Sequence, residues 1–133
     1  MSAADRPVAT PKRPVYLNLF AIRQPIPAIV SILHRISGAL LFLVGIPLIL
    51  TGVQSSLASA ERFAAFEAAW SSPIAKLVLL ALVWSYLHHL LAGLRHLILD
   101  VHIGLDLKAA RMSAALTLVL ALVVTLAIGM RLW

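Results

Sequence analysis

Two segments of this sequence place polar side chains at helical spacing within apolar surroundings. In the first segment, Ser31, Arg35 and Gly38 occupy positions i, i+4 and i+7, so a helix would carry them on one face, with His34 adjacent. Arginine presents a fixed fork of donors, and a serine hydroxyl both donates and accepts hydrogen bonds. This group could bind an anion or polarise the carbonyl oxygens of a quinone head group.

The second segment, 86–100, is rich in histidine. His89, Gly93 and His96 fall at i, i+4 and i+7 of one helix face. A neutral imidazole inside a helical bundle can serve as an axial ligand of haem iron, and a glycine one turn away would leave room for a porphyrin ring. His88 stands beside His89 and makes the register ambiguous, but the spacing to Gly93 favours His89.

Two charged residues lie nearer the aqueous edge of this second segment. Arg95, like His96, could contact the propionate carboxylates of a haem. Asp100 could pair with Arg95, five residues earlier, although the geometry of that spacing is imperfect. Asp100 could instead pair with a residue of a partner subunit.

Each of these features also has a plainer explanation. Arg35 could be a positively charged anchor at the membrane surface, and His34 could lie at the level of the lipid head groups. Small residues at heptad spacing could simply let helices pack closely; they are Ser31, Gly38, Gly45 and Gly52. The combination of hydroxyl, guanidinium and imidazole groups in two short segments favours bound cofactors over packing alone.

The composition indicates that lipid surrounds the elements that carry these residues. The 133 residues are 62% hydrophobic and 12% charged, against roughly 45–50% and about 25% in soluble domains. A soluble chain of this length cannot bury so much apolar surface, which excludes a soluble enzyme with its own cleft. Three stretches without charge predict an all-α integral membrane protein. The predicted transmembrane helices are about 28–53, 73–99 and 112–132.

The basic residues predict an orientation in the membrane. Eight of the eleven Lys and Arg residues lie before or early in the first span, or around the connection between the second and third spans. These regions should face the cytoplasm. Residues 1–27 are then a proline-rich cytoplasmic arm without a signal-peptide core, and 28–133 a three-helix transmembrane domain with a periplasmic C-terminus. A bacterial inner membrane is favoured over a mitochondrial one because no transit peptide is evident. Basic residues that flank spans do not indicate nucleic-acid binding.

Local signals predict further details of the helices. Segment 54–72 is a candidate for a short interfacial helix. Pro73 suits the first turn of the second span, where its missing N–H costs nothing, and Pro47 should kink the first span mildly. The chain has no cysteine, which excludes disulfides and cysteine-ligated metal sites.

With these motifs the sequence resembles the cytochrome b membrane-anchor subunit of succinate dehydrogenase (respiratory complex II), the larger of two such anchors. The resemblance rests on segment 13–19 (RPVYLNL) followed by 31–38 (SILHRISG), and on the pattern HxxxGxRHLxxD at 89–100. The three-span layout covers essentially the whole chain, with hydropathy alone supporting the third helix and segment 54–72. The fold implied is half of a heterodimeric helical anchor bundle.

The resemblance implies a role for each matched residue. His89 would be an axial ligand of the iron of haem b, with the second axial histidine supplied by the smaller anchor subunit. Ser31 and Arg35 would form part of the ubiquinone site. His34 and Arg35 would also lie near the haem propionates, and His96 could contact them.

The resemblance also implies partners, and a reaction for which this chain alone carries no catalytic residue. A flavoprotein subunit would oxidise succinate, and an iron–sulfur subunit docked on the cytoplasmic face would pass the electrons on. Ubiquinone bound near Ser31 and Arg35 would take up electrons and protons. The chain would supply half of the quinone pocket, half of the haem site and the anchor in the lipid bilayer.

Three other functions stay open. An anchor of a quinol:fumarate reductase would support the reverse reaction with a similar chain. A haem-free structural or assembly protein of three helices would use its histidines only for packing. A small proton or ion channel would use His34, His88 and His89 as relay groups.

Overall fold

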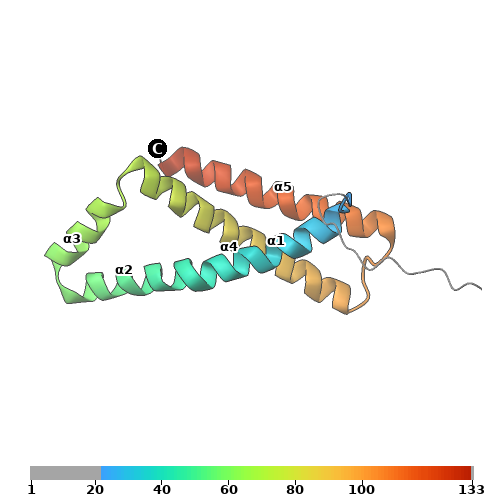
Figure 1. The fold of residues 1–133 in the computed structure, drawn as a ribbon, viewed down its shortest axis with the longest axis horizontal. Helices are drawn as coiled ribbons and strands as arrows, with labels where there is room; N and C mark the ends of the chain where they lie inside the picture. Colours follow the sequence, from blue (N-terminus) through green and yellow to red (C-terminus); the bar gives the residue numbers. More distant parts are fainter. Residues whose placement is uncertain (1–21, 133) are drawn as a thin grey trace, which may run out of the picture.

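The computed structural model describes residues 22–132, and within that range every regular element is a helix (Figure 1). This confirms the predicted all-α class. The elements are α1 (Ile26–Leu40), η2 (Leu41–Gly45), α2 (Ile46–Ala58), α3 (Ala60–Ala69), α4 (Pro73–Asp100) and α5 (Leu107–Leu132). The predictions for residues 1–21 of the N-terminal arm, and for Trp133, lie outside the described residues.

Three helices are long and apolar enough to cross a membrane, as predicted. The first runs unbroken through α1, η2 and α2 from Ile26 to Ala58, over 33 residues, while α4 has 28 residues and α5 has 26. At about 1.5 Å per residue, even α5 extends about 39 Å, more than the roughly 30 Å of a hydrocarbon core. Each helix can therefore span the bilayer with a turn or more to spare.

The helix ends differ from the predicted ones for local reasons. The first helix begins at Ile26 rather than near residue 28, because Pro27 fits its first turn. It continues to Ala58 rather than 53, and the Ser56 hydroxyl in this extension donates to the Val53 carbonyl at 2.8 Å. Asp106 caps α5, accepting from the Ala109 amide at 2.9 Å, and so starts this helix at Leu107 rather than 112.

The irregularity expected from Pro47 lies one turn before that residue. Leu41–Gly45 form a single π-helical turn between α1 and α2. In a regular α-helix the ring of Pro47 would press on the carbonyl of Leu43, four residues earlier, and that carbonyl would lose its N–H donor. A wider turn containing Leu43 accommodates both effects without ending the helix.

Segment 54–72 contains the predicted short helix, α3. Ser59 is extended and caps this helix, accepting a hydrogen bond from the Arg62 amide at 3.1 Å. The chain turns back at this point, so α3 packs on α2. The ring of Phe66 lies against Gly52, where an added Cβ would come within 3.1 Å of the ring. Pro73 occupies the first turn of α4, as predicted, after Ser72 as the cap.

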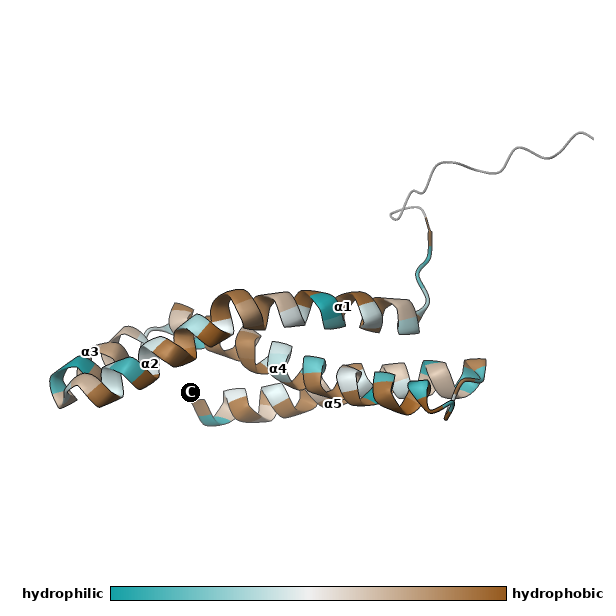
Figure 2. Ribbon diagram, turned by 90° about the horizontal axis from the view of Figure 1, so that it is seen from below, coloured by the Kyte–Doolittle hydropathy of each residue, from teal (hydrophilic) through white to brown (hydrophobic). Residues whose placement is uncertain are grey.

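Few large side chains are buried within the three-helix arrangement of α1, α4 and α5. Its central cluster is small, formed by Val30, Ala92 and Ala114 with Leu118 packed against it, and the other buried hydrophobic residues are Leu82 and Ala121. Large apolar side chains face outward instead; Phe42 and Leu43 are each 68% exposed. Figure 2 shows hydrophobic ribbon along much of the long helices, with hydrophilic turns gathered mainly in α3 and near the α4–α5 connection. Such a surface needs lipid or another protein to cover it.

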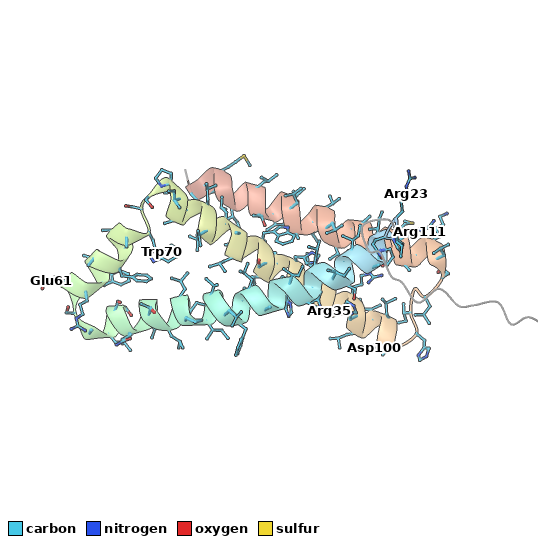
Figure 3. The ribbon with its side chains drawn as sticks, in the orientation of Figure 1. Arg23, Arg35, Glu61, Trp70, Asp100 and Arg111 are labelled. Atoms are coloured by element: carbon cyan, nitrogen blue, oxygen red, sulfur yellow. The ribbon has the colours of Figure 1, made fainter. Side chains whose placement is uncertain are left out.

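The two ends of the molecule carry different parts of the chain. The start of α1 and the α4–α5 connection lie at one end, and α3 and the C-terminus lie at the other (Figure 1). Labelled side chains follow this division: Arg23, Arg111 and Asp100 lie at the first end, and Glu61 and Trp70 toward the second (Figure 3). The helices thus alternate in direction, as three membrane crossings require.

This arrangement predicts which positions share a side of the membrane. Because the chain has no native cysteine, single Ile22→Cys, Glu61→Cys and Leu105→Cys variants can each report on one position. Ile22→Cys and Leu105→Cys should react with a membrane-impermeant maleimide from the same side, and Glu61→Cys only from the other. Permeabilised membranes provide the control for total thiol. Labelling of all three variants from one side would contradict three crossings.

Candidate functional site

Three predicted site histidines from two helices form a stack. The ring of His34 on α1 lies 4.1 Å from that of His89 on α4, centroid to centroid, with 15° between the planes. The ring of His34 also stacks on the ring of His96, with 5.0 Å between the centroids and 29° between the planes. The spacing along α4 predicted that His89 and His96 share a face, and the fold adds that this face meets α1. We call these three residues the histidine cluster.

A glycine on α1 makes this close approach feasible. A Cβ added at Gly38 would lie 2.6 Å from Cε1 of His89, closer than real side chains tolerate. At Gly93 on α4 the corresponding atom would lie 3.6 Å from Nε2 of His34, an ordinary contact. Gly38 is therefore required by the cluster, whereas Gly93 could carry a methyl group. The room beside Gly93, expected for a porphyrin, is occupied by His34 here.

The other glycines at heptad spacing along the first helix, Gly45 and Gly52, do not contact the histidine cluster. Gly45 is buried within the π-helical turn, and Gly52 receives the Phe66 ring of α3. Gly38 alone among the stripe glycines faces a residue of the candidate site. Heptad spacing of small residues therefore indicated close helix packing at Gly38 and Gly52, but at Gly45 the nearest side chain is Leu41 of the same turn.

The hydrogen bond of His89 fixes how its ring is protonated. Nδ1 of His89 lies 2.9 Å from the main-chain carbonyl oxygen of His34. A carbonyl can only accept, so Nδ1 carries the proton and donates it, which leaves a lone pair on Nε2. Ser37 Oγ donates to the same carbonyl at 3.0 Å and lies 3.4 Å from Nδ1. This is the arrangement in which a histidine is held to bind a metal through Nε2.

Ser37 has a part in the cluster that sequence reasoning missed. The side chain is buried, with 1% of its surface exposed, and it touches both histidine-bearing helices through the bonds just described. Its signal in the sequence was a second hydroxyl three residues after His34. That signal is weak because serine side chains commonly bond to their own helix, and only the packing of α4 on α1 shows that the hydroxyl also reaches His89.

His96 is held in a similar way. Its Nδ1 donates to the main-chain carbonyl of Ala92, one turn earlier, at 2.6 Å. The proton on Nδ1 again leaves Nε2 as an acceptor, or as a donor if the ring is protonated. His96 is half-buried at the edge of the cluster, so this nitrogen can meet a polar group that arrives from outside the chain.

Ser31 and Arg35 lie on an open face of α1. Ser31 is half-buried and Arg35 exposed, and Figure 3 shows Arg35 on α1 at the end of the molecule that also holds Asp100. Within residues 22–132, neither side chain has a hydrogen-bond partner and neither lines a cavity that we identify. The two residues form one wall of a site at most, so another surface must supply the remainder.

His88 lies in a different environment from its neighbour. It is fully buried between the helices, stacked on Trp84 at 5.1 Å with 10° between the rings. Neither of its ring nitrogens has a hydrogen-bond partner in the described part of the chain. A cofactor could reach His88 only if the helices separated, whereas His89 is partly exposed. Access therefore favours His89, in agreement with the spacing to Gly93.

Arg95 holds two helices together instead of pairing with Asp100. Its side chain is 7% exposed, its Nε donates to Ser113 Oγ at 3.0 Å, and its Nη2 donates to the Ala110 carbonyl at 3.1 Å. The pairing considered with Asp100 is therefore wrong within this chain; Asp100 is exposed at the end of α4. Five residues along a helix separate two side chains by more than a full turn, while α5 brings its acceptors directly alongside.

The donor set fits a haem better than a bare metal ion. No group of three or more His, Cys, Asp or Glu residues able to hold a metal is found in the described range. A haem iron already has four porphyrin nitrogens, so it needs only one imidazole from each side. Nε2 of His89 can fill one such position. Within residues 22–132 no second histidine is placed opposite Nε2 of His89.

Comparison with known proteins gives a consistent family. Residues 9–128 match the family of the succinate dehydrogenase/fumarate reductase transmembrane subunit. The succinate dehydrogenase cytochrome b556 subunit of Paracoccus denitrificans is 36% identical over 102 residues, which cover 77% of this chain and 78% of that protein. The subunit of the same name from Coxiella burnetii is 35% identical over 123 residues, covering 92% and 98%. That of Rickettsia prowazekii is 30% identical over 115 residues, covering 86% and 89%.

Gly38 and Gly93, which lie beside the histidine cluster, should respond differently to one added methyl group. Gly38→Ala pushes a Cβ against the His89 ring and should destabilise the protein by about 1–3 kcal/mol, the usual cost of overpacking. Gly93→Ala, in the matching position on α4, should cost much less because its Cβ makes an ordinary contact. Thermal unfolding of the detergent-solubilised protein would compare them. Equal losses of stability would contradict the packing described for the cluster.

Proposed function

Because the chain belongs to the succinate dehydrogenase/fumarate reductase transmembrane subunit family, we propose that it is the larger, haem b-binding membrane anchor of a succinate:ubiquinone oxidoreductase. Three apolar helices and the family together make it a multi-pass membrane protein. The relatives are named as cytochrome b556 subunits of succinate dehydrogenase, which supports haem b as the cofactor here. The chain would act within a complex and not as an enzyme by itself.

The observation that carries the haem assignment is the hydrogen bond from Nδ1 of His89 to the His34 carbonyl. It leaves Nε2 of His89 free to be an axial ligand and keeps the ring from rotating. His34 and His96 stack beside His89, and Arg35 follows His34 on α1; the donor groups of these three residues would meet the propionates. When bound, haem b supplies a one-electron carrier within the membrane.

The quinone assignment rests on Ser31 and Arg35. Both belong to α1, one turn apart on one face. The Arg35 guanidinium would polarise one carbonyl oxygen of ubiquinone, and the Ser31 hydroxyl would donate to it or position a proton. Since these residues form only one wall, the iron–sulfur subunit would supply the other, and the flavoprotein subunit would attach through it.

The orientation and the second anchor complete the proposal. The end with the α1 start and the α4–α5 connection would face the cytoplasm of a bacterium, where the basic residues concentrate. The C-terminus would lie in the periplasm. Residues 1–27 would be the cytoplasmic arm, and 28–133 the transmembrane domain. The exposed apolar faces would be covered by lipid and by a smaller anchor subunit that supplies the second axial histidine.

The family leaves one close alternative, an anchor of a quinol:fumarate reductase. The relatives described above are all named for succinate dehydrogenase, which favours succinate oxidation. Their naming as cytochromes also disfavours the haem-free structural protein. A channel that relays protons through His88 is disfavoured by the lack of hydrogen-bond partners for that ring in the described residues.

The two adjacent histidines allow a matched test of the haem assignment. In the purified complex, His89→Ala should abolish or strongly reduce the b-type Soret band, because one axial ligand is lost. His88→Phe, a change at the buried neighbour, should retain the band. Absorbance spectra of the reduced and oxidised complex would show this. A band that survives His89→Ala would mean that the ligand assignment is wrong.

The quinone assignment predicts that two activities separate. Arg35→Ala should lower ubiquinone reduction about tenfold or more, the loss expected for a charged hydrogen bond, while succinate oxidation with an artificial acceptor persists. Arg111→Ala, an exposed arginine at the same end, serves as the control and should change neither. If Arg35→Ala lowers both activities equally, the defect is not specific to the quinone, and the proposed role of Arg35 is contradicted.

A further inference from the structure

A cavity of about 390 Å³ lies between α4 and α5, near the connection that joins them. Its walls are mostly leucine and isoleucine, including Leu94, Leu116 and Leu120, and its polar members are Arg95, Ser113 and Thr117. The histidine cluster does not line it, and neither do Ser31 and Arg35. Nothing proposed above for haem or quinone therefore uses this cavity.

A second hollow extends the cavity along the start of α5. It shares three lining residues with the first (Ala109, Ser113 and Leu116) and adds Lys108 and Asp106. The two together form a groove that is mainly apolar, with Arg95, Ser113, Asp106 and Lys108 as polar members toward the start of α5. We call this the α4–α5 groove.

The polar end of the groove has spare positive charge. Arg95 is buried and uses Nε and Nη2 for its bonds to α5, while Nη1 makes no hydrogen bond to the described residues. A guanidinium donor without a partner in the protein is available to an acceptor from outside the chain. Lys108 lines the second hollow, whose lining residues all lie at the start of α5, and one oxygen of Asp106, Oδ2, is engaged by the Ala109 amide. An anionic group in the groove would meet the spare guanidinium donor, and the long Lys108 side chain could extend toward it.

The apolar part of the groove is open to the bilayer. Leu94 is 49% exposed, Leu116 64% and Leu120 42%, and all three lie on helices that span the membrane. A free phosphate ion would match Arg95 but not these walls, and a neutral quinone would match the walls but not the charge. A phospholipid with an anionic head group matches both ends.

We propose that the α4–α5 groove binds one anionic phospholipid, with its phosphate at Arg95 and Lys108 and an acyl chain along Leu94, Leu116 and Leu120. The lipid would then accept a hydrogen bond from the remaining donor of an arginine that also joins α4 to α5. Basic pockets between membrane helices recognise anionic lipids through this combination of charge and apolar contact.

Photocrosslinking can test this in the assembled complex reconstituted in lipid bilayers. The probes are phosphatidylglycerol and phosphatidylcholine that carry a diazirine on the acyl chain, each at the same low fraction, with crosslinked peptides mapped on the chain. Phosphatidylglycerol should label groove residues at least about fivefold more than phosphatidylcholine, since each basic residue contributes roughly that factor. Lys108→Gln should reduce this preference about fivefold.

Two tryptophan variants separate the groove from the general lipid surface. Leu120→Trp fills the groove and should abolish its labelling, whereas Leu126→Trp, also lipid-facing on α5 at 58% exposure, should leave it intact. Arg95→Gln should also lose the lipid, but Lys108→Gln and Leu120→Trp keep the test valid if that variant fails to fold. Equal labelling by both lipids, labelling unchanged by Leu120→Trp, or a groove covered by protein in the complex would overturn the proposal.

Discussion

The contact between the His89 ring and the main chain of α1 is the interaction on which the candidate site depends. It joins a side chain of α4 to the carbonyl of His34, and it forms only because Gly38 lets the ring approach the α1 backbone. The same contact sets the separation of two membrane-spanning helices and the protonation of one imidazole. Helix packing and the chemistry of the ring therefore cannot be varied independently.

A second constraint is that the chain buries little of its own apolar surface. The core between α1, α4 and α5 has few large side chains, and its buried polar residues make hydrogen bonds such as those of Arg95 to α5. His88 is the exception among them, with no partner in the part of the chain described. Lipid and other subunits must therefore complete the structure, and the quinone wall that we propose at Ser31 and Arg35 would need a second surface for the same reason.

The sequence was a good guide to whatever depends on one helix at a time. Hydropathy predicted the three spans, and Pro73 and segment 54–72 behaved as their local signals indicated. Spacing along a helix shows which residues share a face, but not which helix that face meets. The stacking of His34 on His89, the bonds of Arg95 to Ser113 and the burial of His88 depend on how helices cross. The π-helical turn before Pro47 was likewise not predicted, because the whole preceding turn adjusts to the proline ring.

We propose that His89 of this chain would hold one axial position of haem b through Nε2, with its proton on Nδ1. The most direct measurement is electron–nuclear double resonance on the ferric haem of the complex, with ¹⁵N-histidine incorporated only in this chain. The predicted result is a single strongly coupled imidazole nitrogen from the chain. Coupling to no labelled nitrogen, or to two axial ones, would contradict a haem shared between this anchor and a second subunit.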